Sequence, residues 1–421
     1  MSNNSNSNII SAILWPFGAL YSALKNWRQP WAMNVFWMVC IFMGAIQIFH
    51  PTGEVLGKGA DAGRYVIELQ RMYSSVDNFS QVSRHFYDGS TNDVFRSTLQ
   101  FLVSRFTDNG HVFFFVLAII YGFFYSRNIW YILGKIADQH IQGLWILIAL
   151  FLLVCPIWQI NGVRMWTALH VFCYGAIPYL LEGDKKKLIW PALSILIHHS
   201  FIFPIALLVG FTLIPRRLVM SNSILTGLFV FYLFTLTVKA VDLGVLNSLL
   251  QAYLPGFYED RIDGYVNQTT LVARLKHLSQ NSWHVAFFND LQYWINQLLV
   301  VFSFITIRKC KDRLIGVWPL FAFALLIYGF SNILACVPSG GRYITISKMF
   351  MVSVYLLIYG EMYAISYCKK YLPYILTVLA FSLIFNIRKG LEFYGLGLFG
   401  NYITAIFIDD RTPLIYLIKF L

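Results

Sequence analysis

Charged residues are scarce in this sequence, at 12% of 421 residues, whereas apolar residues make up 58%. An ordinary soluble protein is about a quarter charged. So little charge excludes a soluble globular domain, and many apolar runs approach the roughly 20 residues that a membrane-spanning helix needs. The sequence therefore predicts an all-α, polytopic transmembrane protein. Aromatic residues where apolar runs meet polar ones are typical of interface anchors: Trp27, Trp31, Trp130, Tyr131, Trp158, Trp190 and Trp283.

Several motifs of soluble enzymes are also missing. The six cysteines show no CxxC or Cys/His spacing, so we interpret them as small buried residues rather than disulfides or metal ligands. The sequence has no Walker motif, no GxGxxG and no acidic DxD-like pair on the expected inner face. Nucleotide-dependent chemistry is therefore not expected, and we predict no cofactor and no metal. We interpret the net charge of +12 largely through membrane topology and expect no nucleic-acid partner.

The chain is expected to consist of a short polar tail and one membrane domain. Residues 1–8 form a Ser/Asn tract that we expect to be disordered, with no signal peptide. Residues 9–421 are expected to form a single polytopic domain of about 11 to 12 spans, with large outer loops at about 50–110 and 239–284. The main apolar runs are 31–49, 111–126, 144–159, 163–181, 188–214, 223–238, 286–307, 315–336, 343–365 and 371–385.

Basic residues gather in short loops and predict the orientation of the chain. The expected cytoplasmic clusters are Lys25/Arg28, Arg127/Lys135, Lys185–Lys187, Arg216/Arg217, Arg308/Lys309/Lys311/Arg313 and Lys369/Lys370. The run 188–214 has basic residues at both ends, so a single helix would invert every later loop. We predict instead a helix-turn-helix that dips toward the outer side and returns, with His198-His199-Ser200 at the turn. Each ten-residue arm reaches only about half a bilayer, so the hairpin is expected to be re-entrant or tilted.

Two arginines lie at helix ends in short turns on the expected outer side. Arg164 follows Asn161-Gly162, and Arg342 follows the flexible pair Gly340-Gly341. A guanidinium at the end of a span is costly without an anionic partner, and its fork suits bidentate contact with a phosphate. The alternative is that each side chain extends to the lipid headgroups, which is the commonest fate of such an arginine.

His198 and His199 lie between two strongly apolar runs. A histidine is the commonest general base, and a low-dielectric site keeps the ring unprotonated. The alternative is an interfacial histidine that is bonded within the turn. We favour His198 as the catalytic base, although the sequence leaves the choice between the two open.

Two clusters in the outer loops combine acids, bases and phenols, which suit sugar hydroxyls and ring faces. They are Asp61, Arg64 and Tyr65 in the first loop, and Tyr258, Asp260 and Arg261 in the second. The alternative for both clusters is a solvated loop that happens to be charged.

At these residues the chain resembles the EpsG-like/Wzy family of bacterial polysaccharide polymerases. The resemblance covers most of the chain and rests on Asp61…Tyr65, on Asn161-x-x-Arg164 and on His198/His199-Ser200. The family usually has N-x-x-R-Q, whereas Met165 replaces the glutamine here. The resemblance implies a fold similar to the lipid-linked-donor (GT-C-like) glycosyltransferases.

It also implies a multi-pass enzyme of the bacterial inner membrane that joins undecaprenyl-diphosphate-linked oligosaccharides on the outer face. In this reading the residues that bind the substrate or its diphosphate are Arg64, Tyr65, Asn161, Arg164, Tyr258, Asp260, Arg261 and Arg342, and the catalytic residues are His198, His199 and Asp61. Expected partners are the lipid-linked oligosaccharide, membrane lipid and a chain-length regulator; the product is an O-antigen, capsule or exopolysaccharide.

Two other functions remain open from the sequence. A transporter or flippase of lipid-linked sugars would be expected to show inverted repeats and interrupted helices in matching positions, and we find neither. A membrane O-acyltransferase would also use an intramembrane histidine but would depend on an acyl donor.

Overall fold

The computed structural model describes residues 2–49, 61–87, 94–136, 141–238, 283–337, 339–407 and 412–419. Over these ranges all regular secondary structure is helical, which confirms the all-α prediction. Four helices are long and apolar enough to cross a membrane: Gly110–Leu133, Leu144–Asn161 with its break, Arg342–Ala364 and Ser366–Gly390. Four shorter apolar helices accompany them. The chain is thus a polytopic membrane protein, while the expected number of about 11 to 12 spans stays a prediction.

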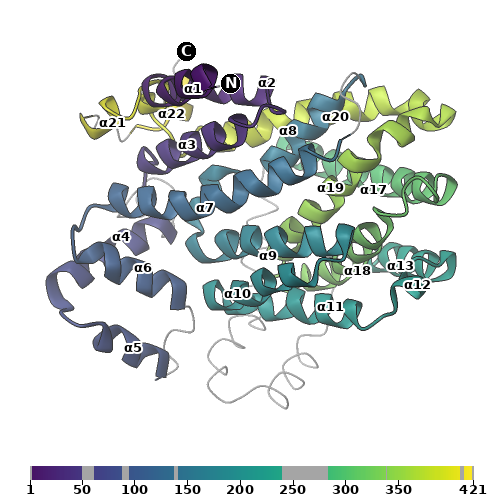
Figure 1. Cartoon of the computed structure of the whole chain (residues 1–421), viewed down its shortest axis with the longest axis horizontal. Helices are drawn as coiled ribbons and strands as arrows, with labels where there is room; N and C mark the ends of the chain where they lie inside the picture. The colour runs from purple at the N-terminus through teal and green to yellow at the C-terminus, as the bar shows by residue number, and fades with distance from the viewer. Residues whose placement is uncertain are drawn as a thin grey trace.

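In Figure 1 the first half of the chain runs from α1, α2 and α3 at the top of the view through α7 to α9. Its helices are α1 (Ser2–Leu14), α2 (Pro16–Lys25), α3 (Ala32–Ala45), α4 (Asp61–Ser75), α5 (Phe79–Tyr87), α6 (Val94–Ser104), α7 (Gly110–Leu133), α8 (Leu144–Val154), η1 (Ile157–Asn161) and α9 (Val163–Glu182). Figure 1 shows α4, α5 and α6 at the left-hand end, beside the main bundle rather than within it.

The second half continues through a broken hairpin into the longest helices. Its elements are η2 (Lys185–Leu188), α10 (Ile189–Ile197), η3 (His199–Phe201), α11 (Ile202–Thr212), α12 (Arg216–Val219), α13 (Asn222–Thr235), α17 (Trp283–Lys309), α18 (Trp318–Leu334), α19 (Arg342–Ala364), α20 (Ser366–Gly390), η5 (Leu396–Phe399), α21 (Thr404–Phe407) and α22 (Leu414–Lys419). Helices α18 and α19 pack against each other, and each buries more than half of its residues.

Small residues bring α3 and α7 into close contact. A Cβ at Gly44 would lie 2.3 Å from the Cβ of Ala118, and one at Gly122 would lie 2.8 Å from the Cβ of Cys40. Helices in a membrane associate through such close packing, because lipid tails are as apolar as the side chains they would replace. The cysteine therefore has the structural role that its apolar surroundings predicted, and it is buried and free.

The apolar run 144–159 is broken near its end. Helix α8 stops at Val154 because Pro156 disfavours a helical Cys155 and has no N–H to donate. The carbonyl groups released by the break are satisfied internally. The Tyr121 hydroxyl lies 3.1 Å from the Cys155 oxygen and 2.9 Å from the Pro156 oxygen, and His170 Nε2 lies 3.1 Å from the former. The chain can therefore turn through η1 within the bundle.

The run 188–214 forms the predicted hairpin. At the C-terminal end of α9, Arg216 donates to the Leu181 carbonyl oxygen at 3.3 Å. At the N-terminal end of α9, the Ser200 hydroxyl lies 3.8 Å from Met165 Sδ. The hairpin thus leaves one end of α9, turns at the other and returns, which confirms the helix-turn-helix, while the side of the membrane that its turn faces stays a prediction. Gly175 permits the close contact, since a Cβ there would lie 2.2 Å from the Lys187 carbonyl oxygen.

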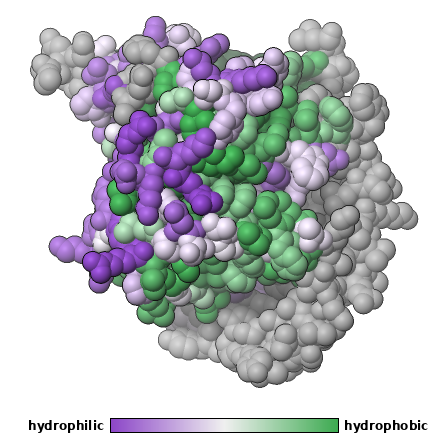
Figure 2. Space-filling model, turned by 90° about the vertical axis from the view of Figure 1, so that its right-hand side faces the viewer, coloured by the Kyte–Doolittle hydropathy of each residue, from purple (hydrophilic) through white to green (hydrophobic). Residues whose placement is uncertain are grey.

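Both ends of the hairpin lie at the right-hand end of the molecule in Figure 1, where α12 carries Arg216 and Arg217. Viewed onto this end, hydrophilic side chains gather beside a broad hydrophobic area (Figure 2). Contacts bring three of the basic clusters together at the C-terminal ends of α7 and α9: Arg28 donates to the Ile136 carbonyl oxygen, Lys135 pairs with Glu182, and Arg216 donates to the Leu181 carbonyl oxygen.

Two expectations about the polar segments differ from the structure. Helix α1 begins at Ser2, whereas the sequence predicted a disordered tail at residues 1–8. The apolar C-terminal half of α1 packs on α2, and this packing stabilises the polar N-terminal turns of the same helix. In the stretch 50–110 the sequence predicts an outer loop and no helix, whereas its described residues form α4, α5 and α6; its position outside the membrane stays a prediction. Its α4 places Tyr65, Leu69 and Met72 on one buried face, so helix formation is driven by packing on α6 rather than by membrane insertion.

Candidate functional site

A cavity of about 250 Å³ lies at the end of the fold where α4 meets the start of α9. Its walls come from four segments that are far apart in the sequence. The lining residues are Asp61, Tyr65, Gln159, Asn161, Gly162, Arg164, Met165, Trp166, His198 and Arg342. The cavity therefore gathers both helix-end arginines and one of the two histidines around a single space.

The first wall is the turn from η1 into α9, which carries Gln159 through Trp166. Its position follows from the break at Pro156, because the released carbonyls are held by Tyr121 and His170 inside the bundle. Gly162 lies under the Trp166 indole, where a Cβ would be 2.5 Å from Trp166 Cδ1. The glycine thus lets an aromatic ring lie at the cavity beside Arg164.

The second wall is the turn of the hairpin. His198 ends α10 in an extended conformation (φ −150°, ψ 114°), and its N–H bonds to the Ser194 carbonyl oxygen at 3.0 Å. The ring is buried, with 7% of the residue exposed. The ring of His199 lies edge-on to it, with the centroids 5.0 Å apart, but His199 does not line the cavity.

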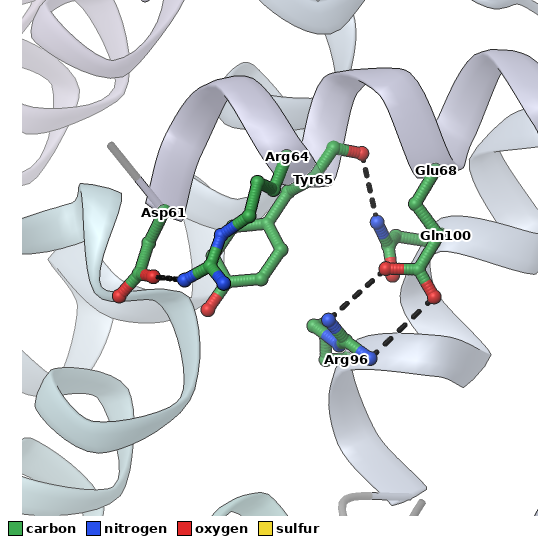
Figure 3. Close-up of polar contacts among 6 residues, drawn as sticks. All are labelled: Asp61, Arg64, Tyr65, Glu68, Arg96 and Gln100. Atoms are coloured by element: carbon green, nitrogen blue, oxygen red, sulfur yellow. Dashed lines mark hydrogen bonds and ion pairs between the residues drawn. The ribbon is translucent and has the colours of Figure 1, made fainter. Parts of the chain in front are cut away.

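The third wall is the first turn of α4 (Figure 3). Asp61 forms an ion pair with Arg64, whose side chain is largely exposed. Tyr65 is 3% exposed, and the Gln100 amide donates to its carbonyl oxygen at 2.8 Å. This hydrogen bond from α6 fixes the helix turn that presents Asp61 and Tyr65 to the cavity.

Arg96 of α6 packs against the Tyr65 ring. Its guanidinium carbon lies 5.2 Å from the ring centroid, and its Nη1 lies 3.0 Å from the Glu68 carboxylate. Burial raises the pKa of the Tyr65 phenol above its ordinary value; the guanidinium of Arg164 acts in the opposite direction, and Asp61 raises the pKa further. The phenol therefore stays protonated near neutral pH and can donate a hydrogen bond.

The fourth wall is the start of α19. Arg342 is exposed and lines the cavity after a tight turn, in which Ser339 has a positive φ of 62°. Gly340 is required in this turn, because a Cβ there would lie 1.7 Å from the Leu334 carbonyl oxygen. The C-terminal end of α18, which lies close to Gly340, therefore determines the position of Arg342.

The structure brings together six residues that the sequence singled out: Asp61, Tyr65, Asn161, Arg164, His198 and Arg342. Arg64 and His199 lie next to the cavity residues but do not line it. Tyr258, Asp260 and Arg261 fall outside the described residues. The roles of all of them in catalysis and binding stay predictions.

Four lining residues were missed by the sequence reasoning: Gln159, Gly162, Met165 and Trp166. Gln159 and Trp166 lie two residues on either side of the Asn161…Arg164 motif, so a wider window around it would have included them. Met165 occupies the position where the resembling family usually has glutamine. It is 5% exposed and contacts Ser200, so it packs the turn of the hairpin against α9.

Among the described residues, no group of three or more His, Cys, Asp or Glu side chains could hold a metal ion. The cationic groups at the cavity are guanidiniums. Independence of a metal remains a prediction.

Comparison with known proteins gives one match. The model of the EpsG family matches residues 35–402, which cover most of the chain and all ten cavity-lining residues. No curated protein and no solved structure matches.

Proposed function

Because the chain belongs to the EpsG family, a membrane-protein family of polysaccharide biosynthesis, we propose that it is a glycosyltransferase that polymerises undecaprenyl-diphosphate-linked oligosaccharides. The reaction takes place on the outer face of the bacterial inner membrane. One observation carries the proposal: two arginines, a histidine, a carboxylate and a phenol line the same cavity.

Arg164 and Arg342 bind the diphosphate of the donor. They approach the cavity from α9 and α19, so two guanidiniums can contact a diphosphate from different sides. A guanidinium presents paired donors that match the geometry of phosphate oxygens. Their positive charge stabilises the negative charge that develops on the leaving diphosphate.

His198 acts as the base. A hydroxyl oxygen of the acceptor sugar attacks the anomeric carbon of the donor, and the bond from that carbon to the diphosphate oxygen breaks. The electron pair leaves with undecaprenyl diphosphate, and the proton of the hydroxyl passes to His198. Its ring suits this role better than that of His199, since only His198 lines the cavity.

Asp61, Tyr65 and Trp166 orient the sugars. The Asp61 carboxylate accepts hydrogen bonds from sugar hydroxyls, and the protonated Tyr65 phenol donates a hydrogen bond to a sugar or phosphate oxygen. The half-buried indole offers a flat face to a sugar ring. Arg64 forms an ion pair with Asp61 beside the cavity.

The deciding experiment is polymerisation in a reconstituted system. Purified protein in liposomes is given purified lipid-linked repeat units, and products are separated by size. A ladder of polymers is expected with the protein and none without it. Transfer of single units across the bilayer without a ladder would instead identify a flippase, and acyl transfer from an added acyl donor would identify an acyltransferase.

A further inference from the structure

A second, larger cavity of about 840 Å³ lies at the opposite end of α9 from the candidate site. Arg164 lines the first cavity and Glu182 lines the second. At ~1.5 Å per residue they are roughly 27 Å apart along the helix, nearly the thickness of the hydrocarbon core of a bilayer. The proposed polymerisation uses none of the residues of this second cavity.

Aromatic and basic side chains dominate its walls. The cavity lies between the chain before α3, the end of α7 and the end of α9, and Lys187 closes one side. Its lining includes the aromatic residues Trp27, Trp130, Tyr131 and Tyr174, and the charged residues Arg28, Arg127, Lys187 and Glu182. These three cations belong to three different basic clusters that the sequence assigned to the cytoplasmic face.

Arg127 is held in place by neutral groups. Its guanidinium donates to Asn34 Oδ1 at 2.8 Å and to Ser126 Oγ at 2.9 Å. It also lies over the rings of Phe123 and Trp37, at 4.2 and 4.7 Å from their centroids. These contacts fix the direction of the guanidinium and leave its positive charge uncompensated by them.

Lys187 and Glu182 complete the charge of the cavity. The Lys187 ammonium lies 5.3 Å from the centroid of the Tyr174 ring. Glu182 accepts from Lys135 Nζ at 2.6 Å, so a lysine outside the lining already offsets its negative charge. Arg127 and Lys187 therefore give the cavity a net attraction for anions.

We propose that this cavity binds the phosphate headgroup of an anionic membrane lipid. Basic pockets between membrane helices on the cytoplasmic side bind such headgroups. Four amphipathic aromatic rings match the headgroup level of a bilayer, where Trp and Tyr concentrate. Met33, Ile136 and Pro178 add an apolar part to the lining, which suits the glycerol and first methylenes of a lipid rather than a free ion.

The test compares two double variants that each remove two positive charges at this end. Arg127→Gln/Lys187→Gln changes the cavity, whereas Lys185→Gln/Lys186→Gln changes two exposed neighbours that do not line it. Each protein is purified in a neutral detergent, and native mass spectrometry measures retention of added phosphatidylglycerol. The cavity variant is expected to bind it about 10- to 30-fold more weakly than the parent, and the control as the parent does.

Folding is checked by thermal unfolding, because Arg127 also ties α7 to α3 through Asn34. If the double variant fails to fold, the single variants Lys187→Gln and Lys186→Gln are compared instead. Lys187→Gln is then expected to bind phosphatidylglycerol several-fold more weakly, and Lys186→Gln as the parent does. Equal retention in the cavity and control variants would overturn the proposal. So would equal binding of phosphatidylcholine, or displacement of the lipid by millimolar inorganic phosphate, since the site would then not select an anionic lipid.

Discussion

The hydroxyl of Tyr343 donates to the backbone carbonyl oxygen of Ser200 at 3.0 Å, although 143 residues separate them in the chain. Tyr343 follows Arg342 at the start of α19, and Ser200 lies in the turn that carries His198. The hydrogen bond therefore ties the proposed phosphate-binding arginine to the proposed base. Any movement of α19 relative to the hairpin changes the distance between these two groups.

Replacing Arg164 by Lys is expected to lower polymerisation about 10- to 100-fold while the protein still folds. The ammonium keeps the charge but loses the bidentate fork, and a charge-assisted hydrogen bond is worth ~1.5–3 kcal/mol. Initial rates of ladder formation in liposomes measure the effect. A variant that polymerises like the parent would show that phosphate recognition by Arg164 is wrong.

Replacing His198 by Ala is expected to lower turnover by about 10²–10⁴-fold, the usual contribution of a positioned base. Binding of the lipid-linked donor should change little, since the arginines contact the diphosphate. His199→Ala is the matched control and should retain most activity because its side chain does not line the cavity.

Donor binding and turnover must be measured separately for both histidine variants. Full activity in both variants would show that another group is the base, and Asp61 would be the next candidate. Loss of donor binding in both would mean that the histidines hold the turn or the substrate.

Chelation is expected to leave activity unchanged, because guanidiniums neutralise the diphosphate in this proposal. The measurement compares polymerisation before and after treatment with EDTA. Inhibition that added magnesium reverses would contradict a metal-independent mechanism.

The orientation predicts which exposed positions react from outside the cell. Ser74→Cys on α4 should be labelled by a membrane-impermeant thiol reagent in intact spheroplasts, and Arg217→Cys on α12 only after the membrane is opened. Parent protein provides the background from its six native cysteines. The reverse labelling would place the candidate site on the cytoplasmic side and rule out the proposed reaction there.

The packing of the hairpin can be tested by adding one methyl group. Gly175→Ala should destabilise the protein by about 1–3 kcal/mol, because its Cβ would lie 2.2 Å from the Lys187 carbonyl oxygen. Gly210→Ala is the control, since no atom lies within 4 Å of its added Cβ. Thermal unfolding in detergent measures both. Equal unfolding temperatures would show that α10 does not pack tightly on α9.

The hairpin could be predicted from the sequence because charge restricts topology. Basic residues at both ends of the run 188–214 require both ends to lie on one side, and this places His198 and Arg164 on the same side of the membrane. The break at Pro156 was harder to foresee. The run 144–159 is apolar up to its last residue, Gln159, and the break is stabilised by hydrogen bonds with Tyr121 and His170, which belong to other helices.

The helices within 50–110 were missed because their apolar faces are narrow. Hydropathy identifies spans that are apolar all round, whereas α4 buries one face on its neighbours. Tyr65, Leu69 and Met72 follow helical spacing, so a search for periodicity would have found this helix. Arg96, however, reaches Tyr65 only through the packing of α6 on α4, which no spacing in the sequence reveals.

The short arms of the hairpin also affect the electrostatic environment of the cavity. From Lys187 to His198 the chain rises only ~17 Å, little more than half of a hydrocarbon core of ~30 Å. The Lys187 backbone packs beside Gly175, within α9 rather than at its C-terminal end, so the short α10 still reaches the start of α9, where the buried His198 lines the cavity. At an effective dielectric constant of about 20, the attraction between a guanidinium and a phosphate is about four times that in water. Mobile ions screen buried pairs only weakly. A phosphate drawn out of water toward the buried His198 is therefore attracted more strongly by Arg164 than by a guanidinium at the exposed surface.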